Sequence, residues 1–401
     1  SAFGYGALET NSTGENNTAV GYGALQLNTT AGNQTACGRL ALQKNTTGYE
    51  NTAVGALALQ DNTTGGSCVA VGVNALSSNT TATENTAVGH QALLANTTGI
   101  HNTALGRDAL KLNTTAHYNT ALGRFTLGSN TTGASNTAVG TNSLGSNTTG
   151  TQNNAVGYNA LDANSTGSYN TAIGVDALTA NTTADNNTAV GHVAMTANTT
   201  GASNAAVGSY ALYGKNALVL NTTGAENTAV GSLTLDANTT GTQNVGVGYG
   251  ALSTNTTGEK NTSVGYYSLV NNTTGVRNTA VGNNSMDNCT TGSYNTAIGS
   301  WSLEDLTTAS QNTSVGYFAS GSTTTGDDNT YLALRVNTTG HSNTALGKKA
   351  LYANTTGDEN VAVGAEALVS LTTSIDTVGV GFGALKAVTT GSYNVGVGRD
   401  C

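Results

Sequence analysis

Hydrophobic and polar positions follow one pattern that returns every 17 residues along almost the whole chain. The stretch from Asn17 to Gly32, NTAVGYGALQLNTTAG, shows one copy. When the residue before Ala-Val-Gly is counted as position one, the repeat reads T-A-V-G-x-x-A-L-x-x-N-T-T-G-x-x-N. No apolar stripe with the 3.6-residue spacing of a helix recurs, and short extended segments between Gly and Asn are typical of strands and turns.

This period predicts an all-β protein, a parallel β-solenoid (β-roll or β-helix) of about 24 turns that forms one continuous array over residues 1–401. A 17-residue coil has a contour of about 56 Å, enough for a flattened turn, and turns stack about 4.8 Å apart. Two turns differ in length. One has a six-residue insertion near 213–218, and the turn at 330–343 is three residues shorter than the repeat. A solenoid accepts both changes without losing its stack.

The core of such a coil is thin, because each turn offers only the residues at positions three and eight and the consensus alanines. The predicted core ladder is Val20, Leu25, Val54, Val88, Val139, Ile173 and Val190. The Gly at position four predicts a backbone with positive φ or a close backbone approach. The Asn at position seventeen, as in Asn51 and Asn85, predicts a stacked amide ladder.

A second asparagine ladder lies at position eleven, where Asn is followed by Thr-Thr or Ser-Thr and so matches the N-x-S/T glycosylation pattern. Its members are Asn11, Asn28, Asn45, Asn62, Asn79, Asn96, Asn113, Asn130, Asn147, Asn164, Asn181, Asn198, Asn221, Asn238, Asn255, Asn272, Asn337 and Asn354. Further sequons lie off this ladder, among them Asn16, Asn33, Asn186 and Asn261.

Two interpretations of the ladder stay open. Asn and Thr favour tight turns, so the motif can be turn chemistry that is copied with the repeat. Alternatively, the asparagines carry a column of glycans that shields the thin core. The ladder is interrupted toward the C-terminal end at Cys289, Leu306, Thr323, Leu371 and Val388, and the apolar replacements favour a site that faces protein.

Composition and the spacing of reactive residues exclude several classes of function. The net charge of −9 gives no basic surface for nucleic acid, and no apolar run approaches the length of a membrane span. The four cysteines lie too far apart along the coil for disulfide bonds within the chain, which leaves pairing between chains open for Cys401, and the five histidines show no metal-ligand spacing. No nucleophile elbow, phosphate loop or recurrent carboxylate pair occurs. We therefore predict a non-enzyme with no catalytic residues, no metal and no cofactor.

The repeats in NTAVGYGALQLNTTAGNQTACG resemble those of tail-fibre and endosialidase-chaperone-bearing surface proteins of bacteria and phages. They are also similar to the 14-residue head repeats of trimeric autotransporter adhesins. The resemblance implies an extracellular or cell-surface fibre or adhesin shaft. We expect a structural subunit that associates with itself end to end and carries glycans. The alternatives are the shaft of a trimeric adhesin or tail fibre that presents a receptor-binding tip, and an ice-binding solenoid.

Overall fold

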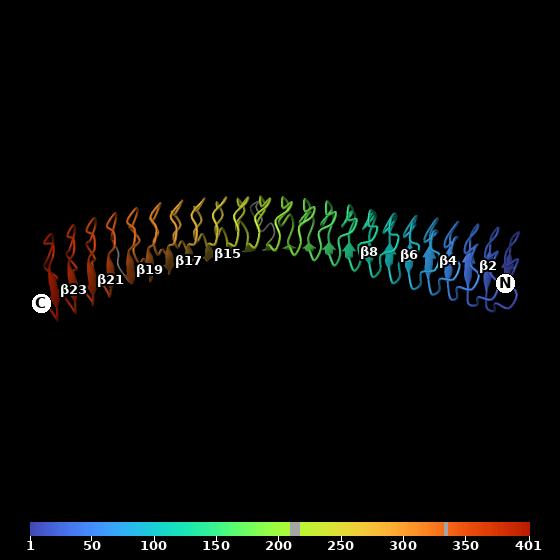
Figure 1. Cartoon of the computed structure of the whole chain (residues 1–401), viewed down its shortest axis with the longest axis horizontal. Coiled ribbons are helices and arrows are strands. Elements are labelled where there is room, and N and C mark those ends of the chain that lie inside the picture. The colour runs from blue at the N-terminus through green and yellow to red at the C-terminus, as the bar shows by residue number, and fades with distance from the viewer. Residues whose placement is uncertain (209–216, 333–335) are drawn as a thin grey trace. The chain divides into compact units, whose positions relative to one another are not determined.

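The computed structural model describes residues 1–208, 217–332 and 336–401. Every regular element in these ranges is a short parallel β-strand, and none is a helix. The chain divides into two compact units, Ser1–Ala202 and Ser203–Cys401, each of which is a stack of turns (Figure 1). The predicted all-β solenoid with a 17-residue repeat is therefore confirmed.

Nearly all strands have three residues and begin at position one of the repeat. Those of the N-terminal unit are β1 (Ala2–Phe3), β2 (Thr18–Val20), β3 (Thr35–Cys37), β4 (Thr52–Val54), β5 (Val69–Val71), β6 (Thr86–Val88), β7 (Thr103–Leu105), β8 (Thr120–Leu122), β9 (Thr137–Val139), β10 (Asn154–Val156), β11 (Thr171–Ile173) and β12 (Thr188–Val190). Those of the C-terminal unit are β13 (Ala205–Val207), β14 (Thr228–Val230), β15 (Val245–Val247), β16 (Thr262–Val264), β17 (Thr279–Val281), β18 (Thr296–Ile298), β19 (Thr313–Val315), β20 (Thr330–Leu332), β21 (Thr344–Leu346), β22 (Val361–Val363), β23 (Val378–Val380) and β24 (Val395–Val397).

The strand register follows the repeat. Ala138 of β9 pairs with Ala155 of β10, one repeat later. The two turns of unusual length keep the same register, because Ala205 pairs with Thr228 across the longer turn and Thr330 pairs with Thr344 across the shorter one. Residues 213–216 of the predicted insertion lie outside the described residues, whereas Ala217 and Leu218 are fully buried.

The glycine at position four meets both conditions that the sequence predicts for it. Gly21 has a φ of 133°, a conformation that side chains strongly disfavour. A Cβ atom on Gly21 would also lie only 2.5 Å from the carbonyl oxygen of Gly38, the equivalent glycine of the next turn. A tight corner and a close backbone approach therefore coincide at this position.

The predicted core ladder is correct at Leu25, which is fully buried, and wrong at position three. Val20, Val54 and Ile173 point outward and are about 40% exposed, with values of 40%, 38% and 43%. The remaining members of that ladder, Val88, Val139 and Val190, are half-buried on the same outward side of their strands. The alanine between the two outward residues of each strand is the buried one, as the pattern exposed-buried-exposed of β2 shows.

The narrow interior explains this correction. Side chains alternate across a strand, so Ala and Val of one strand must face opposite sides. The interior has little space between the inward side of the strand and position seven of the repeat, which is alanine in most turns. Where Thr234 replaces that alanine, even a Cβ atom on the inward Gly246 of β15 would lie 2.5 Å from Cγ2 of Thr234 in the preceding turn. A branched valine on the inward side would clash in this space, whereas alanine leaves room for the leucine at position eight.

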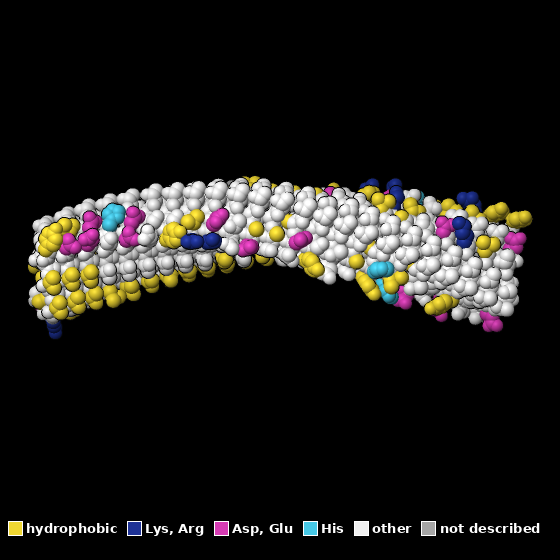
Figure 2. Space-filling view, in the orientation of Figure 1, with side chains coloured by type: hydrophobic (Ala, Val, Ile, Leu, Met, Phe, Trp, Pro, Cys, Tyr) yellow, Lys and Arg dark blue, Asp and Glu magenta, His cyan; other side chains and the backbone are white. Residues whose placement is uncertain are grey.

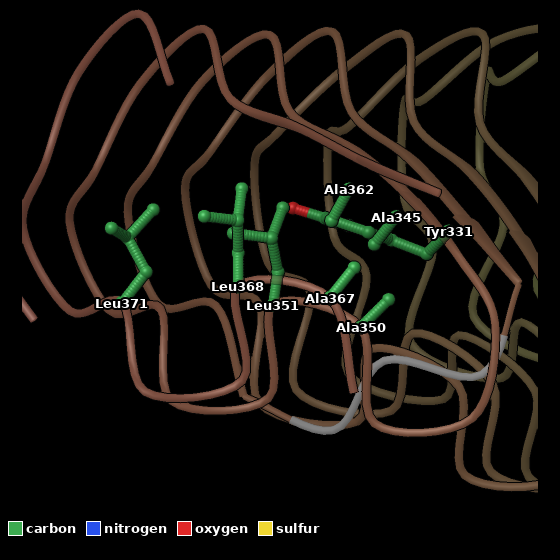
Figure 3. Close-up of a cluster of buried hydrophobic side chains, with 8 residues drawn as sticks. All are labelled: Tyr331, Ala345, Ala350, Leu351, Ala362, Ala367, Leu368 and Leu371. Atoms are coloured by element: carbon green, nitrogen blue, oxygen red, sulfur yellow. The ribbon is translucent and has the colours of Figure 1, made fainter. Parts of the chain in front are cut away.

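One turn fills its interior differently. The shortened turn has Tyr331 at the position that holds alanine in most turns, and this tyrosine is fully buried. Figure 3 shows its ring among the alanines and leucines of the following turns, including Ala345 and Leu351. The side-chain amide of Asn337 donates a hydrogen bond to its hydroxyl, and burial raises the pKa of that hydroxyl well above its ordinary value. The large side chain occupies space in a turn that has three residues fewer than the others.

The Asn-Thr-Thr ladder as candidate site

The position-eleven asparagine follows a tight turn that directs its side chain inward. The backbone N–H of Asn28 donates to the carbonyl of Leu25 at 3.2 Å, which closes the turn. Leu25 has a φ of 51°, and its equivalents in other turns share this left-handed conformation. Left-handed backbone costs a leucine about 1–2 kcal/mol, so burial of the leucine side chain must outweigh that cost.

Each ladder asparagine is held by hydrogen bonds along and across the stack. In the middle of the N-terminal unit, Nδ2 of Asn147 donates to Oδ1 of Asn130 in the preceding turn at 2.8 Å. It also donates to the carbonyl of Gly150 in its own turn at 3.0 Å. Oδ1 of Asn147 accepts from Nδ2 of Asn164 in the next turn at 2.9 Å. The result is a continuous column of amides that all point the same way.

The second asparagine column, at position seventeen, is joined to the first through a shared carbonyl. Nδ2 of Asn136 donates to Gly150 at 2.9 Å, so this carbonyl accepts from both columns. Oδ1 of Asn136 accepts from the backbone N–H of Asn153 at 2.9 Å. The predicted amide ladder at Asn51 and its equivalents is thus confirmed, and it satisfies buried backbone groups that the short strands leave free.

The structure places the candidate glycosylation residues inside the protein. Asn28 and every later candidate through Asn354 are fully buried, and Asn11 in the first turn is half-buried. A glycan bonds to the same Nδ2 atom that donates the ladder hydrogen bonds, and it needs open space beyond that atom. The folded solenoid therefore has no room for glycans on the buried candidates, and the geometry favours the turn interpretation. Of the sequons off the ladder, Asn16, Asn33 and Asn186 are exposed and Asn261 is buried.

The threonines of the motif have two roles. At position twelve, the hydroxyl of Thr46 donates to the carbonyl of Thr63 in the next turn at 3.0 Å, alongside the backbone N–H at 2.9 Å. At position thirteen the side chain is exposed, as at Thr98 and Thr149. One threonine therefore binds neighbouring turns together, while the other covers the corner.

Where the ladder is interrupted, the side chains that replace asparagine also lie in the interior. Cys289, Leu306, Thr323 and Leu371 are fully buried, and Val388 packs partly buried against the core cluster. Two ladder segments end directly before such a replacement. Among the described residues, Oδ1 of Asn272 and Oδ1 of Asn354 are buried acceptors without a hydrogen-bond partner, because Cys289 and Leu371 in the next turns offer no amide. The position thus tolerates apolar side chains, at the cost of an unpaired acceptor.

The four cysteines are free thiols in the described part of the chain, and two of them are deeply buried. Burial raises the pKa of Cys68 to about 11 and that of Cys289 to about 12. Thiolates are the reactive form of cysteine, so both side chains are unreactive near neutral pH. Cys37 and Cys401 are exposed.

The described residues show neither a cluster of metal ligands nor a membrane-spanning helix. Within residues 1–208, 217–332 and 336–401, no three His, Cys, Asp or Glu side chains gather closely enough to hold a metal ion. The described ranges also contain no helix with the length and apolar character that crossing a membrane requires.

Comparisons with protein-family models and with curated proteins find no match for this chain. The resemblance to tail-fibre and autotransporter repeats therefore remains a prediction from the sequence.

Proposed function

We propose that this chain is a non-enzymatic structural subunit that forms the shaft of an extended extracellular fibre. The observation that carries the proposal is the uniform bonding between turns. In the N-terminal unit, Leu144 donates through its backbone N–H to Ala160 at 3.0 Å, and Gly157 donates to Val139 at 2.8 Å. Equivalent bonds recur turn after turn, together with the amide columns. A stack of this kind becomes longer with each repeat, and its interior side chains serve to hold neighbouring turns together.

Copies of the chain associate, in this proposal, through the outward side of the strands. Position three places an apolar side chain on that side in each turn, as at Leu105, Leu122 and Val156 with exposures of 44%, 41% and 40%. Figure 2 shows such side chains as rows of yellow along the C-terminal unit. A continuous exposed apolar surface is typical of an interaction site. It supports side-by-side assembly, including the trimer that the resemblance implies, in addition to the end-to-end association expected from the sequence.

Sedimentation velocity and electron microscopy test this proposal together. We expect rods that assemble side by side as the concentration rises, and we expect a triple variant with Lys at positions 105, 122 and 156 to lose this side-by-side assembly and keep only the end-to-end association. A matched variant with Lys at Thr98, Thr115 and Thr149, which are exposed at the corner, should assemble like the wild type. A monomer at every concentration, or equal behaviour of both triple variants, would contradict the proposed assembly.

A further inference from the structure

One surface of the C-terminal unit carries aromatic side chains at positions five and six of the repeat, and we call it the aromatic row. Its turns begin at strands β15 to β19. Its members are Tyr249, Tyr266, Tyr267, Trp301, Tyr317 and Phe318. The coil does not need aromatic residues there, because the same positions hold His90 and Gln91 in one turn of the N-terminal unit and Thr141 and Asn142 in another.

The row consists of two aromatic groups of similar geometry. In the first group the rings of Tyr249 and Tyr266 are stacked, with centroids 5.5 Å apart and planes 14° from parallel. The ring of Tyr267 meets that of Tyr266 edge-on at 4.5 Å. The three rings thus pack together into a single apolar platform, in which Tyr266 is 53% exposed.

The second group repeats this arrangement around the single tryptophan of the chain. The rings of Trp301 and Phe318 are stacked at 5.3 Å, with planes 22° from parallel. Tyr317 meets Trp301 edge-on at 5.6 Å and is 70% exposed. Because offset and edge-on pairs are the favourable geometries for aromatic rings, both platforms are stable without a ligand.

A polar turn separates the two groups. The backbone N–H of Asn284 donates to the carbonyl of Tyr266, and that of Trp301 donates to the carbonyl of Asn283, each at 2.9 Å. The turns of Tyr266 and Trp301 are therefore two levels apart, about 10 Å along the stack. In the described residues Oδ1 of Asn283 is buried without a hydrogen-bond partner.

Carboxylates adjoin this polar turn. Nδ2 of Asn284 donates to Oδ2 of Asp287 at 3.3 Å. Burial, and then the neighbouring charges of Asp287 and Asp305, raise the pKa of Glu304. The site thus combines amide hydrogen-bond donors and acceptors with nearby carboxylates.

From this arrangement we propose that the aromatic row binds a neutral oligosaccharide along the axis of the stack. A sugar ring has an apolar face of C–H groups that packs on aromatic faces, and its rim of hydroxyls pairs with amides, which both donate and accept. Two platforms with a polar turn between them fit two segments of one glycan chain. The carboxylates Asp287, Glu304 and Asp305 repel anionic glycans, and they also repel nucleic acid, which requires a cationic groove beside its stacking residues.

Trp301 makes the test direct, because the intrinsic tryptophan fluorescence of the whole chain comes from this residue. The probes are cello-, malto-, chito-, manno- and laminari-oligosaccharides, with oligogalacturonate and single-stranded DNA as anionic probes. We expect at least one neutral oligosaccharide to shift the fluorescence in a saturable way, with affinity confirmed by calorimetry. The anionic probes should not bind.

Two variants and a control complete the experiment. Tyr317→Ala removes an exposed ring and should weaken binding about tenfold with no change in circular dichroism. Trp301→Ala should weaken it at least as much, measured by calorimetry. Tyr158→Ala, an exposed tyrosine at position five in the N-terminal unit, should leave binding unchanged.

Three results would overturn the proposal. One is the absence of binding by every neutral probe at millimolar concentration. Another is binding that Tyr317→Ala and Trp301→Ala leave intact. The third is self-association of the chain that Tyr317→Ala abolishes while no saccharide binds, because the row would then be a contact between copies.

Discussion

The amide column at position eleven should be a major source of stability, and Asn147→Ala tests this in the N-terminal unit. The substitution removes the two hydrogen bonds that Asn147 donates and the one that it accepts from Asn164. The carbonyl of Gly150 keeps its second donor, Asn136, whereas Oδ1 of Asn130 loses its donor. A net hydrogen bond contributes about 0.5–1.5 kcal/mol, and a buried unpaired group costs about 1–3 kcal/mol. We therefore expect the free energy of local opening to fall by about 2–4 kcal/mol.

Native-state hydrogen exchange is the suitable assay, because long repeat arrays do not unfold in a single two-state step. The backbone N–H of Asn153, which donates to the other amide column, should report the opening of this turn. Asn154→Ala is the matched control: Asn154 is exposed at position one of its strand, where another turn has Ala205, so exchange should change little.

Asn147→Leu separates hydrogen bonding from volume. Buried leucines already occupy this position at Leu306 and Leu371, so the side chain fits. It still leaves Oδ1 of Asn130 without a donor. Opening free energies for the Leu variant equal to those of the wild type would refute the reasoning, because the column would then contribute only by filling space.

Four further predictions follow from burial. Ala138→Asp, on the inward side of β9, should unfold its turn, whereas Val139→Asp on the outward side should change the melting temperature by only a few degrees; equal effects would restore position three to the core. Tyr331→Ala should cost about 3–5 kcal/mol, measured by hydrogen exchange across the shortened turn, because it leaves a large cavity. The pKa of the Cys68 thiol is about 11 in the folded state and has its ordinary value of 9.0 in the unfolded state. Because the unfolded state loses the proton first, the free energy of unfolding should decrease between these two pH values. Cys68→Ala should remove that decrease, measured in a pH series of thermal melts. Intact mass should match the 39.9 kDa of the chain or exceed it only by glycans outside the buried ladder. Glycans on the fully buried ladder asparagines, from Asn28 to Asn354, would show that the native material does not have this fold.

The sequence by itself determined the repeat and nearly all that depends on local conformation. The 17-residue period gave the parallel solenoid, the Gly of position four gave the corner at Gly21, and the inserted and shortened turns gave registers that the strand pairs confirm. Leu25 could be assigned to the core because a large apolar side chain that recurs at one position of a polar repeat is strongly expected to be buried. These features follow from residue types whose backbone and burial preferences are strong.

Only the tertiary structure decided which side of each element faces inward. In many strands Ala and Val are neighbours that face opposite sides, and the sequence does not determine which of them points into the interior; the narrow interior selects Ala138 over Val139. Asn-Thr-Thr reads equally well as a sequon and as a turn, and the choice depends on partners one turn away, such as Asn130 for Asn147. The aromatic row likewise exists because stacking brings residues 17 positions apart, such as Trp301 and Phe318, into contact. Each of these outcomes arises from contacts between turns, and the sequence of a single turn does not determine those contacts.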